Sequence, residues 1–215
     1  MNDGLTCFST DCRLCTRLAR HLEDVRAEFP DYYAKPVAPF GDTQPRLLVV
    51  GLAPGMHGAN RTGRPFTGDH AGILLYGTLH RFGFANQAVA TGPADGLRLF
   101  GCCITNAVKC LPPQNKPRPE EIRRCNAYLR HEIAGLPNGA VILALGSIAH
   151  RAVLMALGLR PAACPFHHGA RHALPHARSL YDSYHCSRYN TQTKRLTAEM
   201  FHDVVAAISQ HLKSN

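Results

Sequence analysis

The stretch RLLVVGLAPG, residues 46–55, joins a short aliphatic run to the start of a glycine-rich segment. An aliphatic run of this length is typical of a strand that is buried on both faces of a parallel sheet. The glycine-rich segment that follows, residues 51–69, would let a ligand approach the backbone closely, because glycine has no side chain. We therefore expect an α/β fold with a binding site beyond the end of this strand.

Three further strand-like segments alternate with amphipathic helices along the chain. We predict strands at 102–105, 140–145 and 179–184. The first expected helix has its apolar spacing from Leu14 to Phe29 and starts near Asp11, and the second covers 71–82. The third begins at Pro119 and is closed by Gly135, and the fourth is capped by Ser147 and ends at Gly158. Thr197 opens the fifth. This alternation implies right-handed crossovers, and so a four-stranded parallel sheet flanked by helices on both faces, a three-layer α/β/α arrangement.

Length and composition limit the class of protein. The chain has 215 residues, of which 45% are hydrophobic and 18% charged, and this suits a folded domain better than a disordered tail. We expect a single domain over 1–215, with an N-terminal helix and connector in 1–45 and the α/β core in 46–212. No apolar run is long enough to span a membrane and the N-terminus has no apolar signal segment, so we expect a cytoplasmic monomer that makes no membrane contact.

The charge of the chain favours a polyanionic partner. Lysine and arginine number 24 against 15 acidic residues, which gives a formal net charge of +9. Nucleic acid is the first candidate for such a partner. Charge alone does not decide the matter, because many basic proteins bind no nucleic acid.

Three polar or aromatic features follow the predicted strands. Phe66, in the glycine-rich segment, offers a stacking face for a base, although a surface loop with an incidental phenylalanine fits the same residues. Asn106 offers both a donor and an acceptor for a base edge, or else serves as a turn residue. His185 could stabilise negative charge that develops on an oxygen. The carboxyl ends of parallel strands meet at one sheet edge, so the topology brings these three residues together.

The cysteines indicate a metal or cluster site, because nine is an odd number and disulfides are rare in the cytosol. Cys12 and Cys15 have a C-x2-C spacing, and Cys110 and Cys125 complete a set of four thiols for zinc or an iron–sulfur cluster. Cys7, Cys12 and Cys15 also match the plant-type [2Fe–2S] spacing, which leaves an electron-transfer protein as an alternative.

Other cysteines and histidines favour ordinary structural roles. Cys102 and Cys103 suit core packing within a strand, and Cys125 on the apolar face of a helix could do the same. A histidine-rich stretch could bind a metal, but its glycines and prolines favour a loop; it contains Cys164, His167, His168, His172 and His176.

An ordered set of segments resembles one family. The segments GLAPGMHGANRTGRPFTGD (51–69), TNAVKCLPPQNKP (105–117) and HCSRYNTQTKRLTAEMF (185–201) together resemble family 5, or type B, uracil-DNA glycosylases. The likeness begins at CRLCTRL (12–18), continues through DYYAKPVAPFGD (31–42) and covers nearly the whole chain. It implies the four-stranded uracil-glycosylase α/β fold and a structural [4Fe–4S] cluster. By motif position the cluster ligands are Cys12, Cys15, Cys110 and Cys125, with Cys7 in reserve.

The resemblance also implies an activity and a set of site residues. The protein would flip uracil, with hypoxanthine and other deaminated bases as further candidates, out of DNA and hydrolyse the N-glycosidic bond to leave an abasic site. His185 would stabilise the departing base anion. The implied substrate-binding residues are Gly51, Leu52, Ala53, Phe66, Asn106, Ser187 and Asn190, the last two to clamp a DNA phosphate or to support the His185 loop. DNA binding would associate the protein with the nucleoid.

Two positions leave the chemistry open. Asp69 is the carboxylate that the family indicates for catalysis, but an aspartate at the start of a helix is also an ordinary N-cap. The family usually reads His-Pro-Ser where this chain reads His185-Cys186-Ser187, and the loss of proline removes a backbone constraint. A protein that binds damaged DNA through an iron–sulfur cluster without hydrolysis remains the alternative function.

Overall fold

The strand predicted first lies at the centre of the sheet in the computed structural model, which describes residues 8–214. This strand, β2 (Leu47–Gly51), pairs in parallel with β3 (Cys102–Asn106) on one side and with β4 (Val141–Leu145) on the other. β4 pairs in parallel with β6 (Ser179–Ser183). All residues of these four strands are buried, as the aliphatic runs predict for a sheet covered on both faces. The four-stranded parallel core is confirmed.

Two short antiparallel strands extend this core at its edges. β1 (Phe40–Gly41) pairs with β3, and β5 (Arg171–Ala173) pairs with β6. The sheet therefore has six strands in the order β1-β3-β2-β4-β6-β5, and the prediction of four strands was incomplete. Both added strands are too short to produce a recognisable alternation in the sequence.

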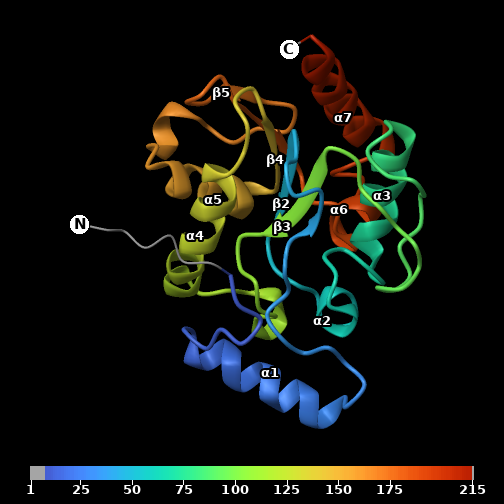
Figure 1. Ribbon diagram of the computed structural model, residues 1–215, viewed down its shortest axis with the longest axis vertical. Coiled ribbons are helices and arrows are strands. Elements are labelled where there is room, and N and C mark those ends of the chain that lie inside the picture. The colour runs from blue at the N-terminus through green and yellow to red at the C-terminus, as the bar shows by residue number, and fades with distance from the viewer. Residues whose placement is uncertain (1–7, 215) are drawn as a thin grey trace.

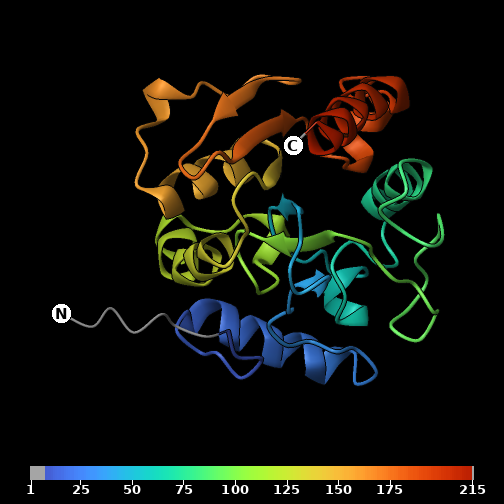
Figure 2. The ribbon, with the colours of Figure 1, turned by 45° about the horizontal axis from the view of Figure 1, so that its top comes forward.

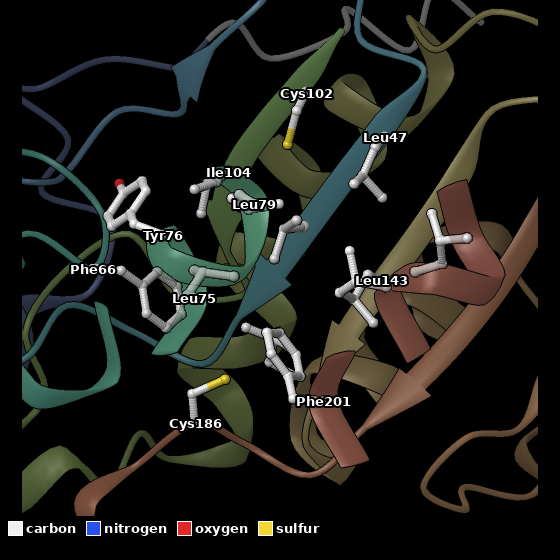
Figure 3. Packing of buried hydrophobic residues seen from close by; sticks show 14 of the residues in the cluster. Leu47, Phe66, Leu75, Tyr76, Leu79, Cys102, Ile104, Leu143, Cys186 and Phe201 are labelled. Carbon is white, nitrogen blue, oxygen red and sulfur yellow. The ribbon is translucent and has the colours of Figure 1, made fainter. Parts of the chain in front are cut away.

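Helices cover both faces of the sheet (Figure 1). α3 (His70–Arg81) and α7 (Ala198–Lys213) pack on one face, where Leu75, Tyr76 and Phe201 meet the side chains of the central strands (Figure 3). α4 (Pro119–Ala134) and α5 (Ser147–Leu157) pack on the other face. The three-layer α/β/α arrangement is as predicted.

Most helix ends follow the expected signals, but the predicted N-cap of α5 was wrong. Thr197 caps α7 by accepting a hydrogen bond from the Met200 amide, and Gly158 ends α5 in the left-handed region with φ of 68°. Ser147 does not cap α5: it is the first helical residue, and Gly146 precedes it with φ of 93°. A residue at that φ needs the conformational freedom of glycine.

The N-terminal helix begins later than predicted. α1 (Thr16–Glu28) has Cys15 as its N-cap residue, and neither Asp11 nor Leu14 belongs to it. Its apolar face packs Leu18, Leu22 and Val25 in a separate cluster with residues that follow β3. α1 lies alongside one end of the sheet (Figure 2), and its apolar cluster includes Cys125 and Tyr128 of α4. Within residues 8–214, no helix combines the length and the apolar character needed to cross a membrane.

Four short helical turns interrupt the connecting segments. Two lie in loops that border the sheet's carboxyl edge, α2 (Ala59–Thr62) after β2 and α6 (Arg188–Gln192) after β6. The others are the 3₁₀ turns Pro113–Asn115 and Pro161–Ala163. None was predicted, since single turns carry no periodic pattern.

Candidate active site

A cleft of about 440 Å³ opens beyond the carboxyl ends of β2, β3 and β6. This is where ligands bind in open α/β sheets, and the volume falls in the usual range for small-molecule sites. The cleft brings together seven of the residues singled out in the sequence: Leu52, Ala53, Phe66, Asp69, Asn106, His185 and Ser187. The predicted convergence of the strand ends is therefore confirmed.

Gly51 makes room for two of these residues. It pairs with Asn106 across β2 and β3, and it is the last residue of its strand. A Cβ atom at position 51 would overlap both the Asn106 side chain and the Phe66 ring. Gly51 thus acts through the absence of a side chain, while the next two residues along the chain line the cleft.

Phe66 adopts a backbone conformation that needs support from its surroundings. Its φ is 54°, which costs energy for a bulky side chain, and residues held in this region often lie at functional sites. Its ring is almost fully buried, and the ring centroid lies 5.9 Å from that of His185.

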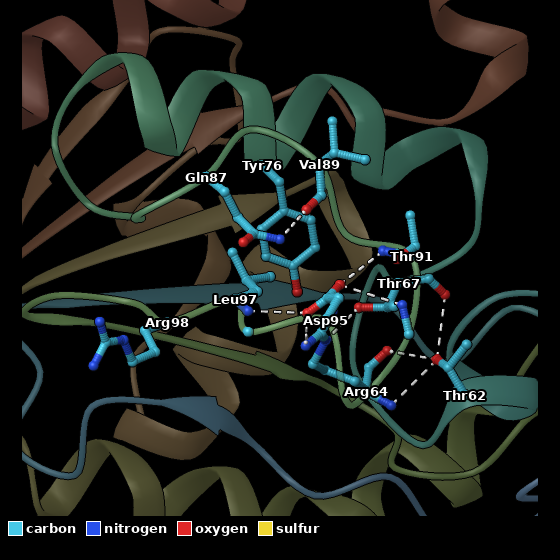
Figure 4. A network of polar contacts seen from close by, with 12 residues as sticks. Thr62, Arg64, Thr67, Tyr76, Gln87, Val89, Thr91, Asp95, Leu97 and Arg98 are labelled. Carbon is cyan, nitrogen blue, oxygen red and sulfur yellow. Dashed lines mark hydrogen bonds and ion pairs between the residues drawn. The ribbon is translucent and has the colours of Figure 1, made fainter.

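The residues on both sides of Phe66 supply this support (Figure 4). Arg64 donates to both carboxylate oxygens of Asp95 at 2.9 and 2.6 Å, and to the hydroxyl of Thr67 at 2.8 Å. Tyr76 donates to the Pro65 carbonyl at 2.6 Å. The guanidinium of Arg64 holds the pKa of Asp95 well below its ordinary value, so this buried pair stays charged and keeps the loop in place.

Asn106 carries an unsatisfied acceptor. Its side chain is 3% exposed, and its Oδ1 atom has no hydrogen-bond partner among the described residues. Buried polar atoms in proteins nearly always have a partner, and an exception at a cleft calls for a donor from a ligand. Asn106 is therefore placed to accept a hydrogen bond from a bound molecule.

His185 follows β6 and faces the same cleft. Desolvation by burial lowers the pKa of its imidazole to about 4, so the ring is neutral at neutral pH. A neutral imidazole can donate one N–H to a ligand oxygen. Asn190 does not line the cleft; its side-chain amide donates to the His185 carbonyl at 2.8 Å and holds the loop.

Asp69 both caps a helix and lines the cleft. Its Oδ1 accepts from the Gly72 amide at 3.0 Å, the N-cap geometry of α3. Burial raises the pKa of its carboxyl above the ordinary value, while the amides of Gly72 and Ala71 oppose this rise. The other oxygen faces Gly55 and Gly58, and a Cβ at Gly58 would overlap the carboxylate. One oxygen is thus committed to the helix and the other remains beside the cleft.

The remaining residues of the His185 loop have distinct positions. Ser187 caps α6 by accepting from the Asn190 amide at 3.4 Å, and it also lines the cleft. Cys186 is fully buried near Phe201 (Figure 3). Burial raises the pKa of its thiol well above the ordinary range, so it stays protonated and does not act as a nucleophile.

Sequence reasoning missed His70, the first residue of α3, which lines the cleft. Its Nε2 lies 3.0 Å from the hydroxyl of Thr191, so it ties α3 to α6. Arg188 also lines the cleft and is exposed at its rim. No spacing pattern indicates His70; only its position after Asp69 connects it with the site.

Four cysteines gather beside this site. Cys12 and Cys15 precede α1, Cys110 follows β3, and Cys125 lies on α4, and all four line one small cavity. The Tyr128 hydroxyl donates to the Cys12 sulfur at 3.1 Å, and the Lys109 amide donates to the Cys125 sulfur at 3.3 Å. Burial raises the pKa of the Cys15, Cys110 and Cys125 thiols, to about 11 for Cys125, so a metal would have to stabilise their thiolate form.

The spacing of the four sulfur atoms restricts the group they could hold. Among the described residues, no three of these thiols place their sulfurs within 4.8 Å of one another. Sulfurs around one tetrahedral zinc ion lie about 3.8 Å apart, since each Zn–S bond is about 2.3 Å. The wider spacing suits a cluster in which each thiolate binds a different iron. Cys7 lies outside the described residues, whereas Cys102 and Cys103 are buried in β3, as expected for packing.

The chain has close relatives of known family. A profile of the Uracil DNA glycosylase superfamily matches residues 38–209. The chain is 51% identical over 203 residues to a type-5 uracil-DNA glycosylase of Thermus thermophilus, with 91% of each chain covered. It is 42% identical over 199 residues to the type-5 enzyme of Pyrobaculum aerophilum, which covers 91% of this chain and 86% of the relative.

More distant relatives share less of the chain. A type-4 uracil-DNA glycosylase of Pyrobaculum aerophilum is 36% identical over 121 residues, or 56% of this chain and 54% of the relative. The crystal structure of Pedobacter heparinus SMUG2 matches with a TM-score of 0.50 at 16% identity, over 91% of this chain and 85% of the other. That likeness supports the fold alone.

Proposed function

The chain belongs to the uracil DNA glycosylase superfamily and, within it, to the type-5 family, and on this premise we propose that it removes uracil from DNA by hydrolysing the N-glycosidic bond. One observation carries the proposal: the unsatisfied Asn106 Oδ1 and the neutral His185 converge with the Phe66 ring on one cleft. Hypoxanthine and other deaminated bases are further candidate substrates.

The donor and acceptor pattern of uracil suits these residues. Its N3–H would donate to Asn106 Oδ1, which satisfies the buried acceptor, while the amide of the same side chain donates to the adjacent carbonyl. The Phe66 ring would stack on the flipped base. Leu52 and Ala53 close the cleft with small apolar surface, and a base that has left its duplex partner would shed its water there.

The main electrostatic task is to stabilise the departing base. Cleavage leaves negative charge on the uracil ring and positive character on the sugar. A neutral His185 would donate a hydrogen bond to the carbonyl oxygen on which that charge develops. The Asn190 bond to the His185 carbonyl would fix the position of this donor. This contact matters because Cys186 does not restrict the backbone of the loop as a proline would.

Asp69 is the proposed second catalytic residue. Its Oδ1 caps α3, and its Oδ2 is the carboxylate oxygen left to position a water or to stabilise the cationic sugar. Within the part of the chain that the structure describes, no lysine lines the cleft. Strand cleavage through a Schiff base is therefore not expected, and the product is an intact strand with an abasic site.

The four cysteines fit a [4Fe–4S] cluster. Their sulfurs are all thiol donors, line one cavity and stand too far apart for a single zinc ion. Cys12, Cys15, Cys110 and Cys125 would hold the cluster, and it would join α1 to the segment that follows Asn106. When bound, the cluster would act as a structural link, since hydrolysis moves no electrons.

DNA is the proposed partner, in line with the net charge of +9 and the exposed cations Arg188, Lys194 and Arg195 after the His185 loop. Binding to DNA would place the protein at the nucleoid. The test is to incubate the protein with duplex DNA that contains uracil and to separate free base from strand by chromatography. We expect free uracil and an uncut strand; DNA binding without base release would favour the alternative of a non-hydrolysing damage-binding protein.

A further inference from the structure

A second group of metal-binding side chains lies away from the cleft and the four cysteines. His150 of α5, His172 of β5 and Asp182 of β6 place three possible ligand atoms within 4.8 Å of one another. Asp182 is fully buried, the His150 side chain is 2% exposed and that of His172 is 13% exposed. β5 and β6 pair at one edge of the sheet and α5 packs on the adjacent strand β4, so the three backbones are fixed relative to one another.

The Asp182 carboxylate has few partners for a fully buried charge. His150 Nδ1 lies 2.7 Å from Oδ1, and His172 Nε2 lies 3.3 Å from Oδ2. Among the described residues, no lysine, arginine or backbone amide donates to this carboxylate. A buried charge needs a close counter-charge or a metal.

His150 shows the second feature of a metal ligand. Its Nε2 lies 2.8 Å from the Cys164 carbonyl, while its Nδ1 faces Asp182. Histidines that bind metals commonly donate the other ring N–H to a backbone carbonyl, which fixes the tautomer and aims the ring. Phe166 packs edge-on against the His150 ring, with the ring centroids 5.6 Å apart, and so helps to hold the ring in place.

We propose that His150, His172 and Asp182 bind one Zn²⁺ ion. Two imidazole nitrogens and one carboxylate oxygen are ligands that zinc accepts readily, and a water would take the fourth tetrahedral position. Zinc would take the place of the contact between His150 Nδ1 and Asp182 Oδ1, and its positive charge would lie beside the buried carboxylate. The ion would fasten β5 and α5 to β6, the strand that leads into the His185 loop.

Most of the histidine-rich stretch takes no part in this site. His168 accepts from the Tyr184 amide at 3.2 Å and stacks on the Tyr184 ring at 5.1 Å. His167 is exposed, and it precedes His172 on the same segment. His167→Ala is therefore a matched control for His172→Ala: both remove one imidazole from this segment, but only the second removes a ligand.

The test measures zinc and iron together on the full-length protein as purified. Wild type and both variants are equilibrated with Zn²⁺ in competition with a chelator, and the zinc and iron bound per chain are determined by mass spectrometry of the metals. We expect wild type and His167→Ala each to bind one zinc per chain. The zinc affinity of His172→Ala should be lower by more than about tenfold, and the iron content should be equal in all three proteins. Equal zinc in wild type and His172→Ala, or no zinc in any of them, would overturn the proposal.

X-ray absorption at the zinc edge of the wild type gives a readout that needs no variant to fold. The proposal requires nitrogen and oxygen ligands at about 2.0–2.1 Å. Sulfur ligands at about 2.3 Å would place the zinc at the four cysteines and would contradict it.

Discussion

The side-chain amide of Asn190 donates a hydrogen bond to the backbone carbonyl of His185 at 2.8 Å. This bond links α6 to His185, the residue after β6 that faces the cleft. The loop has Cys186 between His185 and Ser187, so its backbone lacks the restriction of a proline ring. The Asn190 bond is thus one of the contacts that keeps the imidazole in place.

Replacing Asn190 should slow catalysis more than it weakens binding. In Asn190→Ala the His185 loop loses one anchor, and a small misplacement of a catalytic group lowers the rate steeply. We expect kcat to fall by about tenfold with KM changed little, measured as uracil release from duplex DNA. Thr193→Ala is the control, because its hydroxyl bonds only α6 carbonyls; equal activity of the two variants would show that the Asn190 bond does not position His185.

Protonation of His185 should cost stability in acid. Its pKa is lowered to about 4 in the folded protein from an unfolded value near 6.5, so the unfolded chain binds the extra proton first. The stability contribution is complete above about pH 6.5 and is lost as the pH falls from there to about 4, by roughly 3 kcal/mol at most.

Unfolding by denaturant at a series of pH values, in wild type and in His185→Gln, measures this contribution. As the pH falls through this window, the free energy of unfolding should decrease more for the wild type than for His185→Gln. Parallel curves for the two proteins would show that His185 titrates alike in the folded and unfolded states.

Changing Asp69 to asparagine separates its two roles, as the N-cap of α3 and as a charged group beside the cleft. Asparagine caps helices about as well as aspartate, so Asp69→Asn should leave the melting temperature nearly unchanged. Loss of the charge beside the cleft should slow base release by about a hundredfold, with DNA affinity retained. Single-turnover kinetics and a binding assay on the same samples test this; an unchanged rate would reduce Asp69 to a helix cap.

The four-cysteine site should lose its iron when one ligand is removed. Cys110→Ala should purify with little iron and reduced stability, because α1 would no longer be joined to the segment after β3. Cys102 is the first residue of β3 and is fully buried, and Cys102→Ala should retain the iron of the wild type. Iron per chain and visible absorbance measure both; full iron in Cys110→Ala would reject this ligand assignment.

The sequence predicted the parts of the fold that rest on long periodic patterns. The four buried strands and the five long helices are where the aliphatic runs and helical spacings indicated. The two edge strands and the single turns were missed, because a few residues carry no period. The α1 start was placed too early because Leu14 continues the apolar spacing, yet it lies outside the helix and is 56% exposed.

The candidate site was predictable where it depends on strand ends and was not where it depends on loop contacts. Asn106 and His185 follow β3 and β6 so closely that topology alone brings them together. The Arg64–Asp95 pair that holds Phe66 joins residues 31 positions apart in two irregular loops, and no local pattern indicates it. The same holds for His150 and Asp182, which meet because α5 packs against β4, the strand next to β6.

The measurement that tests the central claim most directly is the single-turnover rate of uracil release from duplex DNA by the wild type and by His185→Ala. His80→Ala serves as the control, since that histidine is exposed at the far end of α3. We predict rapid release by wild type and His80→Ala, and a loss of about a hundredfold or more in His185→Ala with DNA binding preserved. Equal rates for wild type and His185→Ala, or no uracil release by the wild type, would contradict the account.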